Sequence, residues 1–298
     1  MFVFLELSSL VIFAYYLSHA YRNSNLGFLF LLFLFVSLVE NLSIVMFAGQ
    51  EGGYFYNQGF YVFLFETPLF IILFWTCIVY SAYNIIKKVT DSKRQLLFLT
   101  PIYVLVLDII MDVVAVKMNL WTWIGFENGE GFYGVPASNY LGWLILPFSF
   151  IFVWDRLYLV QKERIRSSLA RILYIFVPIV SFLLFLAIMW SLYKLKYILA
   201  LSLVGQYYLS IIIFLIFLIL GVYNFRINKN QQENKSFGLF NIRYFLHLFS
   251  IFGLFWAGLY RDVVLLVILG IILAFEFYVF SKYFDLGAKI ALVKKSKI

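Results

Sequence analysis

Two acidic residues stand four positions apart in a very apolar segment of the chain, LLFLTPIYVLVLDIIMDVVAVK (residues 96–117). In a helix, Asp108 and Asp112 share one face, because residues four apart are neighbours. Two carboxylates this close in a medium of low dielectric do not both ionise easily, so we expect a protonated acid beside an ionised partner. Such a pair can donate a proton to a substrate, and Lys117 near the helix end could partly offset its charge.

The elements that must position these acids are membrane-spanning helices. The chain of 298 residues is 64% hydrophobic and 13% charged, which is roughly half the charged fraction of a soluble domain. Apolar runs of about 20 residues recur along it, each long enough to cross a bilayer. We therefore predict an all-α polytopic membrane protein, with residues 1–298 as a single integral-membrane helical domain. The nine expected spans are residues 2–20, 26–48, 60–84, 95–117, 137–160, 171–193, 198–222, 240–259 and 262–284.

The positions of the basic residues predict the orientation. Most of the 23 Lys and Arg residues, Arg243 among them, fall around loops on one side of the membrane; the exceptions are Lys117, Lys194, Lys196 and Arg261. Because basic loops stay in the cytoplasm, we expect a multi-pass protein of the cell membrane with its N-terminus outside and its C-terminus in the cytoplasm. The net charge of +8 belongs to these short loops, so we expect no nucleic-acid partner.

Depth along the spans groups four acids. Glu40, Glu66, Asp108 and Asp112 all lie within roughly 14 Å of the expected outer face, counted at about 1.5 Å per helical residue. Charged side chains inside a membrane cost about 2.5–3.5 kcal/mol each and commonly mark functional sites. One interpretation is that each acid hydrogen-bonds a neighbouring helix and holds the bundle together. We favour the other, a shared polar cavity in the outer half, and we expect Glu276, which lies apart, to be structural.

Two outer loops are rich in aromatic residues and glycine. One is MNLWTWIGFENGEGFYGVPASNYLGW (118–143), and the other is GQEGGYFYNQGF (49–60). Aromatic residues at this depth commonly form an interface belt. The glycines and Pro136 instead indicate defined turns, and the two loops together could cover the acidic cavity. The residues expected to bind a substrate there are Glu66, Trp121, Trp123, Tyr133, Asn139 and Trp143.

An ordered set of these residues resembles the carotenoid biosynthesis membrane-protein family, which includes carotenoid 1,2-hydratases and bisanhydrobacterioruberin hydratase. The family pattern is a membrane Glu and a Gly/Tyr-rich loop, then Pro and Trp, an Asp near an Ala-Val pair, Trp-x-Trp, and Gly-Val-Pro with Asn and Gly-Trp downstream. The chain departs from it at Val113, where members often have Pro. Within residues 36–145 the matching positions are Glu40, Gly52–Tyr56, Pro68, Trp75, Asp112, Ala115, Val116, Trp121, Trp123, Gly134–Pro136, Asn139, Gly142 and Trp143.

The resemblance implies acid-catalysed hydration of a terminal isoprenoid double bond in an acyclic or monocyclic carotenoid. A proton donor converts the alkene to a tertiary carbocation, which water then captures. Asp112 or Asp108 would donate the proton and Glu40 would position the water, while Trp and Tyr faces stabilise the cation. The expected partners are a membrane-dissolved carotenoid or other polyprenyl lipid and the bilayer, with no cofactor and no metal.

Other functions are compatible with parts of the pattern. A carotenoid end-group cyclase would use the same acid to start ring closure without water. An intramembrane prenyltransferase has a D-x-x-x-D motif like Asp108–Asp112, but Asp155 and Asp262 form no second Asp-rich motif. A proton-coupled transporter would also hold buried acids, although no inverted repeat is visible. A di-iron hydroxylase needs many histidines, and this chain has only His19 and His247.

Overall fold

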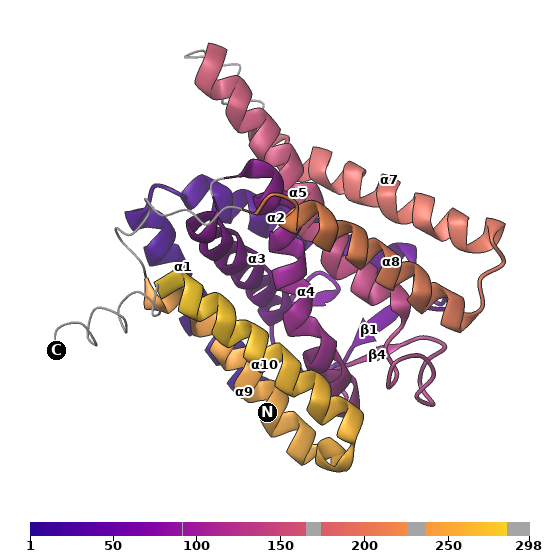
Figure 1. Ribbon diagram of the computed structural model, residues 1–298. Coiled ribbons are helices and arrows are strands. Elements are labelled where there is room, and N and C mark those ends of the chain that lie inside the picture. The colour runs from indigo at the N-terminus through magenta and orange to yellow at the C-terminus, as the bar shows by residue number, and fades with distance from the viewer. Residues whose placement is uncertain (91, 165–173, 226–235, 285–298) are drawn as a thin grey trace, which may run out of the picture.

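The computed structural model describes residues 1–90, 92–164, 174–225 and 236–284 (Figure 1). Within these residues nine helices are long and apolar enough to cross a membrane, which confirms the predicted all-α polytopic membrane protein. They are α1 (Phe2–Arg22), α2 (Leu26–Met46), α3 (Leu69–Val89), α4 (Lys93–Lys117), α5 (Ala137–Arg164), α7 (Val177–Ile198), α8 (Leu203–Val222), α9 (Asn241–Trp256) and α10 (Val263–Phe284).

Helices α3 and α4 form the centre of the bundle (Figure 1). In the apolar part of each helix, 94% of the residues are buried in α3 and 78% in α4, compared with 11% in α8 and 28% in α10. α4 packs against α3, α5, α8 and α9, so its side chains reach most of the interior. The peripheral helices are apolar on the outside as well as the inside, which is typical of helices that face lipid.

A tight turn at the end of α4 leads the chain into a short strand. α4 ends at Lys117, and Asn119 then adopts a left-handed backbone conformation with φ of 57°. Asn tolerates this conformation better than most residues, because its short polar side chain can hydrogen-bond locally. The turn places Trp121–Trp123 directly beside the last turns of α4, which carry Asp112.

The two aromatic loops pair with each other as a two-stranded sheet (Figure 1). β1 (Tyr54–Tyr56) runs antiparallel to β4 (Trp121–Trp123), with Tyr54 opposite Trp123 and Tyr56 opposite Trp121. Residues two apart on a strand share a face, and so do residues directly opposite each other. The two tyrosines and two tryptophans therefore point to the same side of the sheet.

The prediction of a span over residues 60–84 is wrong at its start. α3 begins at Leu69, and strands β2 (Phe63–Leu64) and β3 (Thr67–Pro68) precede it as an antiparallel hairpin. Pro68 stands at the helix N-cap with an extended backbone, since proline favours the start of a helix over its interior. Apolar composition continues through the hairpin, which is why hydropathy alone extends the helix too far.

Glu66 lies in the turn of this hairpin and not inside a membrane span. Its side chain is exposed, and its backbone N–H donates a hydrogen bond to Asn41 Oδ1 at 3.0 Å. Glu66 would lie at the depth of the other three acids only if the chain were helical at this position. That grouping is therefore wrong for Glu66.

Glu276 is paired inside the bundle at a distance from the sheet. Arg243 contacts it through Nε at 2.7 Å and Nη2 at 2.8 Å, and Tyr103 donates its hydroxyl to Glu276 Oε1 at 2.6 Å. Arg243 lies in the first turn of α9, inside the span predicted over residues 240–259, and it is 0% exposed, so its charge is buried and does not belong to a solvated loop. Its charge is compensated by Glu276, and the contacts join α4, α9 and α10.

Candidate active site

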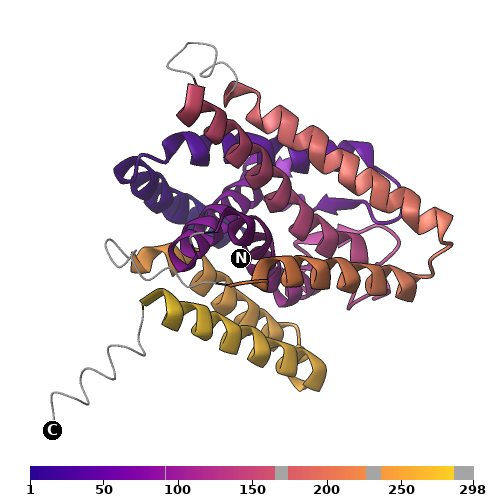
Figure 2. The same cartoon turned by 45° about the horizontal axis from the view of Figure 1, so that its top comes forward.

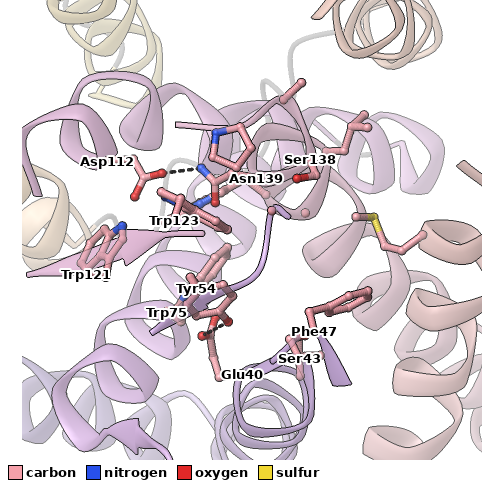
Figure 3. A pocket seen from close by; sticks show the side chains of 18 of the residues that line it. Glu40, Ser43, Phe47, Tyr54, Trp75, Asp112, Trp121, Trp123, Ser138 and Asn139 are labelled. Carbon is pink, nitrogen blue, oxygen red and sulfur yellow. Dashed lines mark hydrogen bonds between the residues drawn. The ribbon is translucent and has the colours of Figure 1, made fainter. Parts of the chain in front are cut away.

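A cavity of about 750 Å³ lies at the end of the bundle where α2 and α4 end and α3 and α5 begin. Its wall is mostly apolar with a few polar groups, which is the usual character of a site for a small apolar ligand. Three of these polar groups are Glu40 on α2, Asp112 on α4 and Asn139 on α5 (Figure 3). Three separate helices thus bring acid and amide groups to one place.

Asp112 faces the cavity as the front member of an acid pair. Asn139 donates hydrogen bonds from Nδ2 to Oδ2 of Asp112 at 2.6 Å and to Oδ2 of Asp108 at 2.8 Å. The two hydrogens of one amide nitrogen allow both bonds at once. Asp112 lines the cavity, whereas Asp108 lies one turn earlier on α4 and is 0% exposed. The spacing in the sequence identified the pair, and the structure adds the bridge from α5.

Glu40 is held by strand β1. Tyr54 and Tyr56 both donate their hydroxyl groups to Oε2 of Glu40, at 2.8 and 2.7 Å. The carboxyl group is buried but lines the cavity, and neither phenol occupies its other oxygen, Oε1. Since a carboxylate can accept several hydrogen bonds, Oε1 can still accept one from a water or ligand.

Aromatic rings surround the two acids. Trp121 and Trp123 lie near Asp112 (Figure 3), on the face of the sheet that they share with the tyrosines. Trp75 of α3 stacks on Trp143 of α5 with ring centroids 3.7 Å apart. All four indoles line the cavity. The faces of aromatic rings attract cations, so this wall suits a positively charged intermediate.

Some buried polar atoms near the acids lack a hydrogen-bond partner among the described residues. They include Asp108 Oδ1, Trp123 Nε1 and the hydroxyl of Tyr140. A buried group left in this state costs about 1–3 kcal/mol, and unpaired groups are uncommon in folded proteins. Trp123 lines the cavity beside Asp112, so its N–H can turn to that carboxyl group or to a polar group of a ligand there.

The arrangement has the groups that acid–base chemistry on an apolar substrate requires. Asp112 and Glu40 line the same cavity, although they come from different helices. One acid is bridged to a second carboxyl group, and the other accepts two phenol hydrogen bonds. Among the residues that the structure describes, no three or more His, Cys, Asp or Glu side chains gather as metal ligands.

The structure brings most of the expected substrate-binding residues to the cavity, but not all of them. Trp121, Trp123, Asn139 and Trp143 line it, whereas Glu66 lies in the exposed hairpin turn. Tyr133 does not reach the cavity either.

Tyr133 instead joins the loop before α5 to the start of α10. Its hydroxyl donates to Asp262 Oδ2 at 2.6 Å, while Asp262 Oδ1 accepts from the backbone N–H groups of Val264 and Leu265. The hydrogen bond to Asp262 raises the pKa of Tyr133, and the same bond lowers the pKa of Asp262. This geometry indicates a structural contact.

Tyr54 and Tyr56 were not predicted from the sequence as partners of Glu40. The stretch YFY alternates its tyrosines with period two, as WTW alternates its tryptophans. This period is typical of a strand with one buried face, and it is the signal that could have paired the two segments. The glycines around both segments indicated turn-rich loops, so this strand pattern was not used to predict the pairing.

A protein-family profile matches most of the chain. The profile of the family described as "Carotenoid biosynthesis protein" matches residues 1–209. The match covers Glu40, Asp108, Asp112, Asn139 and both strands of the sheet, and it extends well beyond the segment in which the sequence motifs were recognised. No curated protein and no solved structure matches the chain. Since the match covers more than half of the chain, the protein belongs to the carotenoid biosynthesis protein family.

Proposed function

We propose that this protein is a carotenoid hydratase, which adds water across a terminal isoprenoid double bond of an acyclic or monocyclic carotenoid. The observation that carries the proposal is that Asp112 and Glu40 face one mostly apolar cavity whose wall includes five tryptophans. Family membership supports a role in carotenoid biosynthesis, and the side chains of the cavity favour the finer assignment.

The first step is proton transfer from Asp112 to the less substituted carbon of the double bond. The alkene π electrons form the new C–H bond, and the positive charge appears on the tertiary carbon. Asp112 is the donor because it lines the cavity, and the Asn139 bridge to Asp108 fixes its orientation. Positioned acids of this kind contribute about 10²–10⁴-fold to a rate.

The second step is capture of the carbocation by water. Glu40 Oε1 accepts a hydrogen bond from the water, whose oxygen lone pair forms the C–O bond. The proton released from the water passes to Glu40, and a return of one proton to Asp112 through solvent completes the cycle. The product is a tertiary alcohol, heavier than the substrate by one water molecule, and no electrons are transferred to or from a cofactor.

The aromatic wall stabilises the intermediate between these steps. The faces of Trp121, Trp123 and Trp75 carry partial negative charge and attract a cation without forming a covalent bond to it. An apolar wall also keeps bulk water away from the cation, so capture is limited to the molecule held by Glu40. The substrate reaches the site from the bilayer in which it dissolves, and in the proposed orientation the site lies in the outer half of the cell membrane.

The proposal is tested by expressing the protein in a host that accumulates acyclic carotenoids and measuring product masses. A hydratase gives a product heavier by one water, and growth in water labelled with heavy oxygen places the label in that product. An isomer of unchanged mass would instead identify an end-group cyclase, which starts from the same protonation. Proton flux in liposomes without any product would favour a transporter.

A further inference from the structure

The cavity extends beyond the two acids toward α7 and α8. Its wall there includes Met189 and Tyr193 of α7 together with Gln206 and Leu209 of α8. Asp112 and Glu40 come from other helices, and the proposed hydration does not require the part of the cavity between α7 and α8. This part of the cavity therefore has room for a portion of the ligand other than its reacting end.

Helices α7 and α8 are consecutive in the chain but lie apart in space. α7 packs against α2 and α5, and α8 packs against α4 and α5, with no extensive contact between α7 and α8. Figure 2 shows the two helices meeting at their connecting loop and separating away from it. Their outer faces carry exposed apolar residues such as Leu183, Ile211 and Ile212. In a bilayer, lipid chains would therefore contact both sides of the gap.

Gly142 of α5 also lies on the cavity wall, on the helix against which both α7 and α8 pack. A Cβ atom added to it would meet no other atom within 4 Å, apart from its own helix and chain neighbours. By contrast, a Cβ at Gly221 would press on Leu99, and one at Gly253 on Val114, so those glycines are needed for helix packing. Glycine inside a helix costs about 1 kcal/mol relative to alanine. At position 142 this cost has no packing reason, and its effect is to leave the cavity open.

We infer that the isoprenoid substrate passes sideways between α7 and α8, over Gly142, with its terminal group at Asp112 and Glu40 and the rest of its chain in the lipid. The inference rests on the proposed function for the identity of the ligand. An extended carotenoid is about as long as the hydrocarbon core is thick, ~30 Å. Because the cavity occupies only one end of the bundle, a substrate of that length has to emerge from it.

The route makes Gly142 a residue that determines which substrates enter. A leucine there would project into the open space and obstruct a long chain, whereas an alanine adds only one methyl group. Gly270 of α10 is the matched control, because a Cβ there also meets no atom within 4 Å and the residue does not line the cavity. Replacing glycine inside either helix favours helix formation, so neither leucine variant is expected to unfold the protein.

The test compares wild type, Gly142→Leu, Gly142→Ala and Gly270→Leu, each purified in detergent from a host that makes acyclic carotenoids. The amount of carotenoid bound per protein is measured by absorbance. Gly142→Leu should bind at least roughly tenfold less than wild type, a loss of the size that overpacking of a filled site produces. Gly142→Ala should fall between them, and Gly270→Leu should match wild type. Equal binding by Gly142→Leu and wild type, or no binding by wild type, would overturn the route.

A second readout separates the route from the reaction. Hydration is measured in the same variants with a short isoprenoid that carries the same terminal double bond but no long chain. Gly142→Leu should lower hydration of the full-length carotenoid at least roughly tenfold more than hydration of the short substrate, and equal loss on both would contradict the route. Binding of carotenoid by wild type without any hydrate would refute the proposed function and leave the route standing.

Discussion

The side-chain nitrogen of Asn139 lies 2.6 Å from Oδ2 of Asp112, and this hydrogen bond ties the start of α5 to the end of α4 at the cavity wall. The same nitrogen also contacts Asp108, so one amide orders two carboxyl groups. A carboxyl group that must deliver a proton to one particular carbon atom benefits from a fixed orientation. The Asn139 bridge is therefore expected to support the rate of proton transfer.

Replacement of Asn139 by alanine should lower the hydration rate by about 10- to 100-fold, the equivalent of losing a hydrogen bond to a charged group. The effect should fall mainly on kcat, because Asn139 positions the acid. Initial rates in isolated membranes measure it. Asn23→Ala is the control, since Asn23 is exposed at the end of α1 and bonds only to the backbone of its own helix. A normal rate for Asn139→Ala would show that the bridge has no role in catalysis.

Asp108 and Asp112 should differ in importance, although the sequence presents them as a pair. Asp108→Asn should retain measurable hydration, because Asp108 lies behind Asp112 and does not face the cavity. Asp112→Asn should lose about 10²–10⁴-fold, since it removes the proton donor itself. Rates of the two variants at matched expression decide this. A larger loss for Asp108→Asn would mean that the roles are reversed.

Tyr54 and Tyr56 should act together on Glu40. Each phenol donates to the same carboxyl oxygen, so either one alone can hold the acid. We expect a loss of a few fold for each single Tyr→Phe variant and a much larger loss for the double variant, because contacts that share a partner are not additive. Rates of both singles and the double measure this coupling, with Tyr61→Phe as the control on an exposed tyrosine. If the loss in the double variant equals the product of the two single losses, Tyr54 and Tyr56 do not share the task of holding Glu40.

Arg243 and Glu276 should govern stability and not catalysis. Arg243→Met removes the guanidinium partner of buried Glu276 and leaves only Tyr103 and His247 beside that carboxyl group, a change that costs about 3–5 kcal/mol. The double variant Arg243→Met/Glu276→Leu should recover most of this loss, because it removes both charges. Thermal unfolding in detergent measures the stability of both variants. The fraction of Arg243→Met that remains folded should hydrate the substrate at the wild-type rate per folded protein. A double variant less stable than the single would contradict this account.

The helices and the acid pair were predictable because their signals are local. A span is a run of about 20 apolar residues, and Asp108 and Asp112 share a face at a spacing that any helix imposes. The depth of Glu40 followed in the same way from counting along its helix. These inferences require no knowledge of which helices are neighbours.

The contacts that complete the site depend on residues distant in the sequence. β1 pairs with β4 across the whole of α3 and α4, and only this pairing places the tyrosines on Glu40 near Asp112. The pairing of Arg243 with Glu276 is equally non-local. Without knowledge of this partner, Arg243 looks like one of the basic residues around a loop, whereas the structure buries it against Glu276. The prediction that Glu66 lies inside a membrane span was wrong for another reason. Apolar composition does not distinguish a hairpin from the first turns of a helix.

The most direct test of the central claim is the product mass formed by four proteins in a carotenoid-producing host: wild type, Asp112→Asn, Glu40→Gln and Glu66→Gln. Glu66 is the matched control, an exposed acid of the β2–β3 turn that lies outside the cavity. We predict a product heavier by one water molecule from wild type and Glu66→Gln, and its loss in both Asp112→Asn and Glu40→Gln. Unchanged hydrate formation in both cavity variants would contradict the assignment of these two acids.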